Sequence, residues 1–198
     1  MQPAPHALLL DFDGLLADYD HRCHLQGLAM AAGCNAAQIE QRLRGEGLEL
    51  AHARGELDGP ALLHELNTRL GSQLQEHHWI EARSAASRLR ADVMAVLRSL
   101  RAEIRVAVLT NNGTLSVAAI KAQLPGMDVL GSACLGVRKP DPRCYLTAVE
   151  RIGSTPSRTL FIDHLFRNVR GAREAGLQAD TAFHAQSLQR VLRRYRVF

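Results

Sequence analysis

Asp11 and Asp13 are the first residues of the chain whose types and spacing could do chemistry. They follow the apolar run ALLL, which has the length and composition of a buried strand. Side chains of an extended segment alternate with a period of two, so the two carboxylates should lie on the same side and reach the same substrate. An aspartate carboxylate can act as a nucleophile. The alternative interpretation is a turn at a strand end with two solvated carboxylates.

Polar groups also follow later strand-like runs. The run IRVAVL stops at Thr110, the run TLFI stops at Asp163, and Lys139 lies between them in the segment RKPDP. From residue 104 onwards, strand and helix patterns alternate, which predicts a parallel sheet covered by helices on both faces. Ligands of such a sheet bind beyond the carboxyl ends of its strands, so these groups could converge although they lie far apart in the sequence.

Four segments in this order, DFDGLLAD, VLTNN, RKPDP and LFIDHLFRNVRGAREAGL, resemble the motifs of the haloacid dehalogenase superfamily. The resemblance is to its phosphatase branch with a helical cap inserted after the first strand, and it covers nearly the whole chain. It implies a Rossmann-like, doubly wound parallel sheet with a small all-α cap. The implied activity is Mg²⁺-dependent hydrolysis of small phosphorylated metabolites, with sugar phosphates favoured, through an aspartyl-phosphate intermediate.

The resemblance also assigns catalytic roles. Asp11 would be the nucleophile, and Asp13 would protonate the leaving oxygen and then activate water, which is general acid–base catalysis. The dehalogenase branch lacks the second aspartate, so Asp13 favours phosphate chemistry. Thr110 and Asn111 would donate hydrogen bonds to phosphoryl oxygens, with a helix N-cap as the alternative, and Lys139 would add a positive charge there.

The implied metal site consists of Asp11, the backbone carbonyl of Asp13, and Asp163, an oxygen set that suits Mg²⁺. His164 departs from the pattern, because relatives commonly carry a second acidic residue there. Its imidazole could lie just outside the metal ligands and favour Mn²⁺ or Co²⁺, or it could only pack beside the loop. This departure leaves open a degenerate protein that binds a phosphorylated ligand or partner without turnover. The four motifs are also compatible with a phosphomutase.

The helical segment between the first two motifs predicts the domain boundaries. We expect a core at 1–16 and 89–198 and a helical cap at 17–88, with a helix from 74 to 86 and another that begins at Leu89. By resemblance, residues near the junction of cap and core contact the leaving group. The candidates are Asp18, Tyr19, His21 and Arg54, with a cap hinge or cap packing as the alternative.

Composition narrows the class of protein. The 198 residues carry a net charge of +4 and 46% hydrophobic residues, which is ordinary for a globular enzyme, and an excess of arginine over lysine suggests a bacterial source. No signal peptide, membrane span or nucleic-acid motif is readable, so we expect a cytoplasmic protein without nucleic-acid or membrane partners. The four cysteines have no metal-binding spacing and are expected to be buried thiols. Histidines at 21, 24, 77 and 78 are expected on helix surfaces, and no heptad pattern indicates an oligomeric state.

Overall fold

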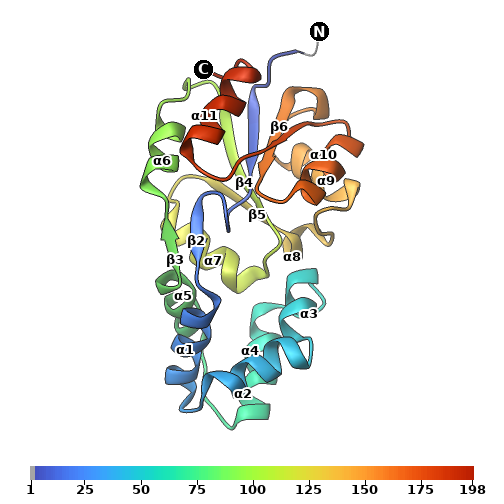
Figure 1. Ribbon diagram of the computed structural model, residues 1–198. Helices are drawn as coiled ribbons and strands as arrows, with labels where there is room; N and C mark the ends of the chain where they lie inside the picture. Colours follow the sequence, from blue (N-terminus) through green and yellow to red (C-terminus); the bar gives the residue numbers. More distant parts are fainter. Residues whose placement is uncertain (1–2) are drawn as a thin grey trace.

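The computed structural model describes residues 3–198 (Figure 1). Its main sheet has five parallel strands in the order β5-β4-β1-β6-β7. This architecture confirms the predicted Rossmann-like α/β core. The strands are β1 (Ala7–Leu10), β4 (Arg105–Thr110), β5 (Asp128–Gly131), β6 (Thr159–Asp163) and β7 (Gln178–Thr181).

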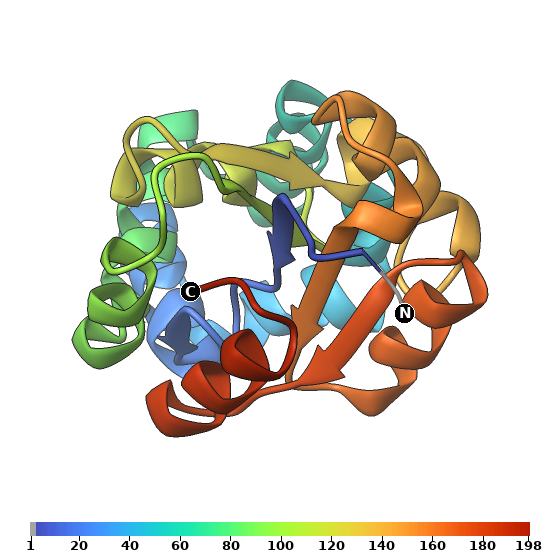
Figure 2. The same ribbon diagram turned by 90° about the horizontal axis from the view of Figure 1, so that it is seen from above.

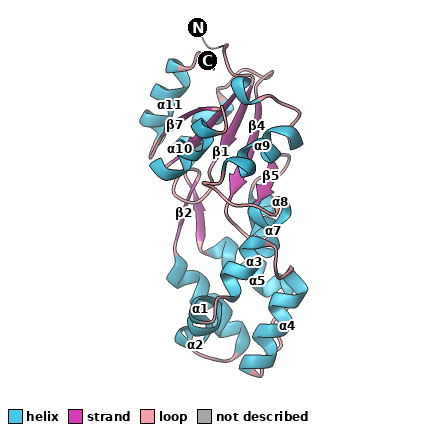
Figure 3. Cartoon of the chain, turned by 90° about the vertical axis from the view of Figure 1, so that its right-hand side faces the viewer, coloured by secondary structure: helices cyan, strands magenta, loops and turns pink. Residues whose placement is uncertain are grey.

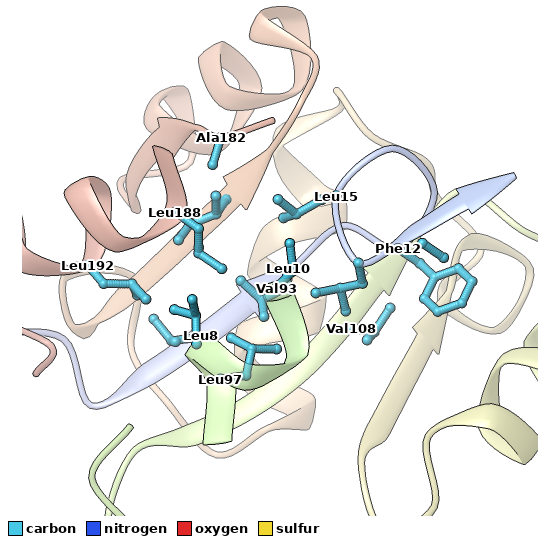
Figure 4. Close-up of a cluster of buried hydrophobic side chains, with 14 of the residues drawn as sticks. Leu8, Leu10, Phe12, Leu15, Val93, Leu97, Val108, Ala182, Leu188 and Leu192 are labelled. Atoms are coloured by element: carbon cyan, nitrogen blue, oxygen red, sulfur yellow. The ribbon is translucent and has the colours of Figure 1, made fainter. Parts of the chain in front are cut away.

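The central strand β1 is buried on both faces, so it is apolar throughout. Leu8 and Leu10 pack into one core cluster, and Ala7 and Leu9 pack into the opposite one. Helices cover both faces, as the view from above shows (Figure 2), and Figure 4 shows the first cluster. The first face is covered by α6 (Ala91–Arg98), α7 (Thr114–Gln123) and α11 (Ala185–Arg194), and the second by α9 (Pro142–Arg151) and α10 (Phe166–Glu174).

A group of helices is inserted after β1 and lies below the sheet in Figure 3, beyond the carboxyl ends of the strands. The chain enters it through β2 (Ala17–Tyr19) and leaves it through β3 (Ser87–Leu89), and these two strands pair antiparallel. We call residues 20–86 the cap. Its helices are α1 (His21–Ala32), α2 (Ala36–Glu40), a π-helical turn (Gln41–Gly45), α3 (Leu48–Arg54), α4 (Gly59–Leu70) and α5 (Glu76–Ala85).

Side chains at the helix ends explain where cap helices begin. Asp20 accepts a hydrogen bond from the backbone N–H of Cys23, and Asp58 accepts one from Ala61, so both are N-caps. The cap has its own buried cluster, which includes Trp79. Leu115 of core helix α7 also belongs to this cluster, so apolar packing holds the cap against the core.

The structure corrects the prediction for residues near the junction of cap and core. The helix predicted from Leu89 is present, but its predicted start is wrong, because Ser87–Leu89 is a strand and the helix begins at Ala91. The predicted helix at 74–86 spans Glu76–Ala85. Strands of three residues are too short to show alternation, and their formation depends on a distant partner. Two short elements complete the chain: α8 (Ser132–Leu135) and a 3₁₀ turn (Pro156–Arg158).

Some expectations of burial were also wrong. Cys134 is exposed and only Cys144 is fully buried, although all four cysteines are free thiols. His24 is 2% exposed rather than on a helix surface, since its ring packs edge-on against Trp79. Within residues 3–198, no helix combines the length and apolar character needed to cross a membrane.

Candidate active site

A buried lysine links the ends of β1 and β6. Lys139 Nζ lies 2.7 Å from Asp11 Oδ1 and 2.9 Å from Asp163 Oδ2, and it also donates to the carbonyl of Leu109 at 2.8 Å. These contacts use all three N–H groups of the ammonium. The structure therefore brings together three of the predicted residues, with Lys139 as a clamp between two carboxylates.

Burial and charge oppose each other in this cluster. Burial alone would raise the pKa of the Asp11 carboxyl, but the charge of Lys139 and hydrogen bonds from His164 and Lys139 lower it. Burial likewise acts to lower the pKa of Lys139, and the carboxylates of Asp11 and Asp163 raise it instead. Asp11 is thus an ionised carboxylate and Lys139 an ammonium at neutral pH. An ionised Asp11 is the form that can attack an electrophile.

His164 lies against the same carboxylates. Its Nδ1 is 3.1 Å from Asp11 Oδ2 and 3.5 Å from Asp163 Oδ1, and the hydrogen bond with Asp11, against the effect of burial, raises the pKa of His164. The ring packs on Gly14, whose φ is 85° and where a Cβ would come within 2.7 Å of it. Asp11, Asp163 and His164 offer ligand atoms that all lie within 4.8 Å of one another.

Asp13 is held from the cap side. Arg83 of α5 is 1% exposed, and its Nη2 donates to both carboxylate oxygens of Asp13, at 2.7 and 2.8 Å. The guanidinium also lies over the ring of Tyr19, 4.1 Å from its centroid. Asn112 Nδ2 adds a contact of 3.2 Å to Asp13. The Asp13 carboxylate is therefore fixed by one group from the cap and one from the core.

The loop after β4 uses its polar side chains in different ways. The Thr110 hydroxyl accepts from Asn112 Nδ2 at 2.7 Å, which leaves its own O–H free to donate. The Asn111 side chain makes two 2.9 Å hydrogen bonds to the backbone N–H and C=O of Lys139. The expected alternative, a side-chain N-cap on the following helix, is not found, because α7 begins after Gly113 without a capping side chain.

The predicted substrate residues of the junction take different positions. Asp18 pairs with Arg90 at 2.6 Å across the β2–β3 ribbon. The Tyr19 hydroxyl bonds His24 Nδ1 at 2.8 Å and lies 3.4 Å from His21 Nδ1, so the last residue of β2 contacts two histidines of cap helix α1. Arg54 is the one of the four candidates that lines a pocket next to the site.

A small cavity lies at the carboxyl ends of the strands, among the groups described above for Asp11, Asp13 and Thr110. It has a volume of about 210 Å³ and is lined by both aspartates after β1, by the loop after β4, and by groups after β6. A second cavity of about 230 Å³ lies between cap and core, with Trp79 and His52 on its cap side and Asn112 and Ser116 on its core side. Both cavities are lined by Asn111 and Asn112, so the loop after β4 forms part of the wall of each.

Three contributing residues were missed by the sequence reasoning: Arg83, Asn112 and Asn168. Asn168 Nδ2 donates to Asp163 Oδ2 at 2.8 Å from the first turns of α10. A signal existed for Arg83, because it shares a helix face with Trp79 and Ala82, and an arginine on an apolar face needs a buried partner. The partner cannot be inferred from the residues near Arg83 in the sequence, because Asp13 lies 70 positions away.

The order and geometry of these groups agree with a family comparison. A family model described as haloacid dehalogenase-like hydrolase matches residues 5–176. The chain belongs to the haloacid dehalogenase-like hydrolase family. A curated relative, the phosphatase MT3486 of Mycobacterium tuberculosis (strain CDC 1551 / Oshkosh), is 28% identical in an alignment of length 191 that covers 87% of this chain and 85% of that protein.

Solved structures of haloacid dehalogenase-like proteins share the fold. The enzyme BT-2542 of Bacteroides thetaiotaomicron, in a complex with magnesium and inorganic phosphate, superposes with a TM-score of 0.74 at 19% identity, over 94% of this chain and 98% of that one. An L-2-haloacid dehalogenase of Xanthobacter autotrophicus superposes with a TM-score of 0.60 at 20% identity, over 98% of this chain and 84% of that one. The same fold therefore occurs in a protein that binds inorganic phosphate and in a haloacid dehalogenase.

Proposed function

We propose that this hydrolase is a phosphatase of small phosphorylated metabolites, with sugar phosphates favoured, that works through an aspartyl phosphate. The observation that carries the proposal is the fixed carboxylate of Asp13 in the cavity that Asp11 also lines. Phosphate transfer to a carboxylate needs a second group that can protonate the leaving oxygen, and Asp13 supplies it. The curated relative named as a phosphatase supports the same choice.

In the first step, the ionised carboxylate of Asp11 attacks phosphorus, and the bond from phosphorus to the leaving oxygen breaks. The carboxylic acid form of Asp13 gives its proton to that oxygen and becomes a carboxylate, so the product leaves as an alcohol. In the second step, a water molecule attacks the phosphorus of the aspartyl phosphate and Asp13 takes a proton from it. Inorganic phosphate leaves, Asp11 is regenerated, and Thr110 is placed to donate its O–H to a phosphoryl oxygen.

The donor set at the strand ends fits a divalent cation. Asp11 and Asp163 carry two negative charges and Lys139 carries one positive charge, so the cluster retains a negative charge that a cation would offset. The two carboxylates and the Asp13 carbonyl would hold Mg²⁺, with Mn²⁺ or Co²⁺ as the alternatives. Bound there, the ion would reduce the repulsion between Asp11 and the phosphoryl group.

The test is release of inorganic phosphate from an aryl phosphate and a panel of phosphorylated metabolites, with Mg²⁺ and with Mn²⁺. We expect turnover by the native chain and none by Asp11→Asn. Asp13→Asn should retain substrate binding and lose turnover of substrates with a poor leaving group. Equal inactivity of the native chain and Asp11→Asn over the whole panel would favour a binding protein without turnover. Transfer of phosphate to a sugar hydroxyl rather than to water would favour a phosphomutase.

A further inference from the structure

An arginine-lined pocket adjoins the catalytic cavity. It has a volume of about 750 Å³ and shares Asn111, Arg138, Lys139 and Arg167 with the smaller cavity that contains the two catalytic aspartates. Arg54, from the end of cap helix α3, lines only the larger pocket. The two spaces therefore share a wall that contains Arg138 and Arg167, and Arg54 of the cap lines the larger space.

Some basic side chains of this pocket are paired with carboxylates and others are not. Arg143 pairs with Asp141 at 2.7 Å, and Arg54 lies 3.7 Å from Glu56, with both members of that pair more than half exposed. Lys139 is neutralised by the catalytic carboxylates. Arg138 and Arg167 form no ion pair with any group in residues 3–198. Two guanidinium groups thus remain without a carboxylate in the wall that both spaces share.

Arg138 is the better defined of the two. It is half-buried, and its Nε is inaccessible to solvent and has no hydrogen-bond partner. Its backbone neighbour is the clamp residue Lys139, whose position the side chain of Asn111 fixes. Burial, and next the charge of Arg54, lower the pKa of Arg138, although the group remains a cation. Partial burial of a guanidinium that has no carboxylate partner is unfavourable, and an anion in the pocket would offset this cost, because the planar set of donors matches a carboxylate or a phosphate.

We infer that the substrate is a small phosphate monoester with a second anionic group, a carboxylate or a second phosphate. Arg138 and Arg167 bind that group while the reacting phosphoryl lies at Asp11, and Arg54 adds a cation from the cap side. The inference rests on the proposed phosphatase function and names the substrate class of that site. The cavity between cap and core, with Trp79 and His52 in its wall, offers a less basic space for the neutral part of the molecule.

The experiment compares pairs of phosphate esters that differ in the second charge. Glycerol 3-phosphate and 3-phosphoglycerate test the carboxylate, and fructose 6-phosphate and fructose 1,6-bisphosphate test the second phosphate. We expect kcat/KM for the doubly anionic member of at least one pair to be about tenfold or more above that of its partner, the effect of one charge-assisted hydrogen bond. The pair with the larger ratio identifies the group.

Variants then locate the effect. Arg138→Gln and the exposed Arg167→Gln should each reduce this ratio about tenfold, and Arg138→Lys should reduce it less, because it keeps the charge but loses the planar donors. Arg143→Gln is the matched control. Arg143 lies in the same pocket but is paired with Asp141, so the kcat/KM ratio measured with this variant should equal that of the native chain. Thermal unfolding of each variant verifies that it folds.

Calorimetry with the Asp11→Asn variant measures the affinity for each member of a pair. The preference for the doubly anionic member can then be determined without turnover. A native enzyme that releases phosphate equally well from both members of each pair, with no response of the ratio to Arg138→Gln or Arg167→Gln, would overturn the inference and leave the phosphatase proposal intact. Absence of turnover with charge-dependent binding would instead overturn the phosphatase proposal and support the anion site.

Discussion

The buried Arg83 of the cap and the partly exposed Asp13 of the core form an ion pair in which one guanidinium nitrogen reaches both carboxylate oxygens, at 2.7 and 2.8 Å. The pair joins the cap to the proposed acid–base group. Arg83 does not line the catalytic cavity, so it acts on Asp13 and not on the substrate. It is a positioning residue.

The first prediction follows from this pair. Arg83→Ala should lower kcat about 10²-fold with a smaller change in KM, because a small displacement of a catalytic group costs about this factor. Arg83→Lys should recover part of kcat. The control is Arg88→Ala, which removes an exposed arginine from the same stretch of chain and should leave kcat near the native value. A purely structural role for Arg83 would show as a lower thermal midpoint with native kcat in the folded fraction.

The second prediction concerns His164 and the metal. A carboxylate in place of this imidazole adds negative charge beside Asp11 and Asp163, so His164→Asp should strengthen Mg²⁺ activation. Changes around metal ligands typically alter affinity about 10- to 100-fold. Titrations of activity with Mg²⁺ and Mn²⁺ measure the half-saturating concentrations, and the variant should show a lower value for Mg²⁺ and a smaller difference between the metals. Superimposable curves for the native chain and the variant would remove His164 from the site.

The third prediction tests the two hydrogen bonds between Asn111 and the Lys139 backbone. Asn111→Ala should lower the free energy of unfolding by about 1–3 kcal/mol, since each intramolecular hydrogen bond contributes about 1 kcal/mol. Activity should fall about tenfold or more, because the clamp lysine loses its fixed position. The control is Asn35→Ala, which removes the capping box of α2 and should cost about 1 kcal/mol of stability with little loss of activity. Equal losses of activity in both variants would mean that stability alone explains the effect.

The fourth prediction is a pH dependence of stability. Burial, and next the charges of Arg83 and His21, lower the pKa of His24 from 6.5 to about 3. The folded state keeps this imidazole neutral while the unfolded chain takes up a proton below 6.5, so the free energy of unfolding falls as pH decreases from 6.5 toward 3. The contribution is at most about 1.4 kcal/mol per pH unit. Denaturation between pH 7.5 and 4.5 should show a smaller slope for His24→Gln than for the native chain.

The control for this measurement is the exposed His77→Gln, whose slope should match the native one. An unchanged slope for His24→Gln would mean that the unfolded and folded states bind protons equally at this residue.

The sequence was most informative where chemistry follows regular structure. Asp11, Lys139 and Asp163 were predicted to converge because apolar strands end just before two of them and parallel strands end at one edge, and the structure brings all three into hydrogen-bond contact. Residues whose role depends on a distant partner were not predictable in the same way. The partner of Arg83 is fixed only by how the cap packs on the core.

The β2–β3 ribbon was missed for a related reason. Its pairing, with Ala17 opposite Leu89, joins segments on either side of the whole cap, and three residues on each side carry no periodic signal. The arginine pocket was foreseen only through Arg54, because the motif segments that contain Arg138 and Arg167 do not show that these two side chains line one wall.

This ribbon has a consequence for how such a chain can change over evolutionary time. Because the first and last residues of the insertion lie side by side, its length and content can be altered without moving the strand ends that carry Asp11 and Asp163. The catalytic carboxylates and the cap helices are thereby encoded in separable stretches of the chain, so the cap can be exchanged as a single module while the strand ends stay in place. Arg83 limits this freedom, since any replacement module must again supply a cation for Asp13.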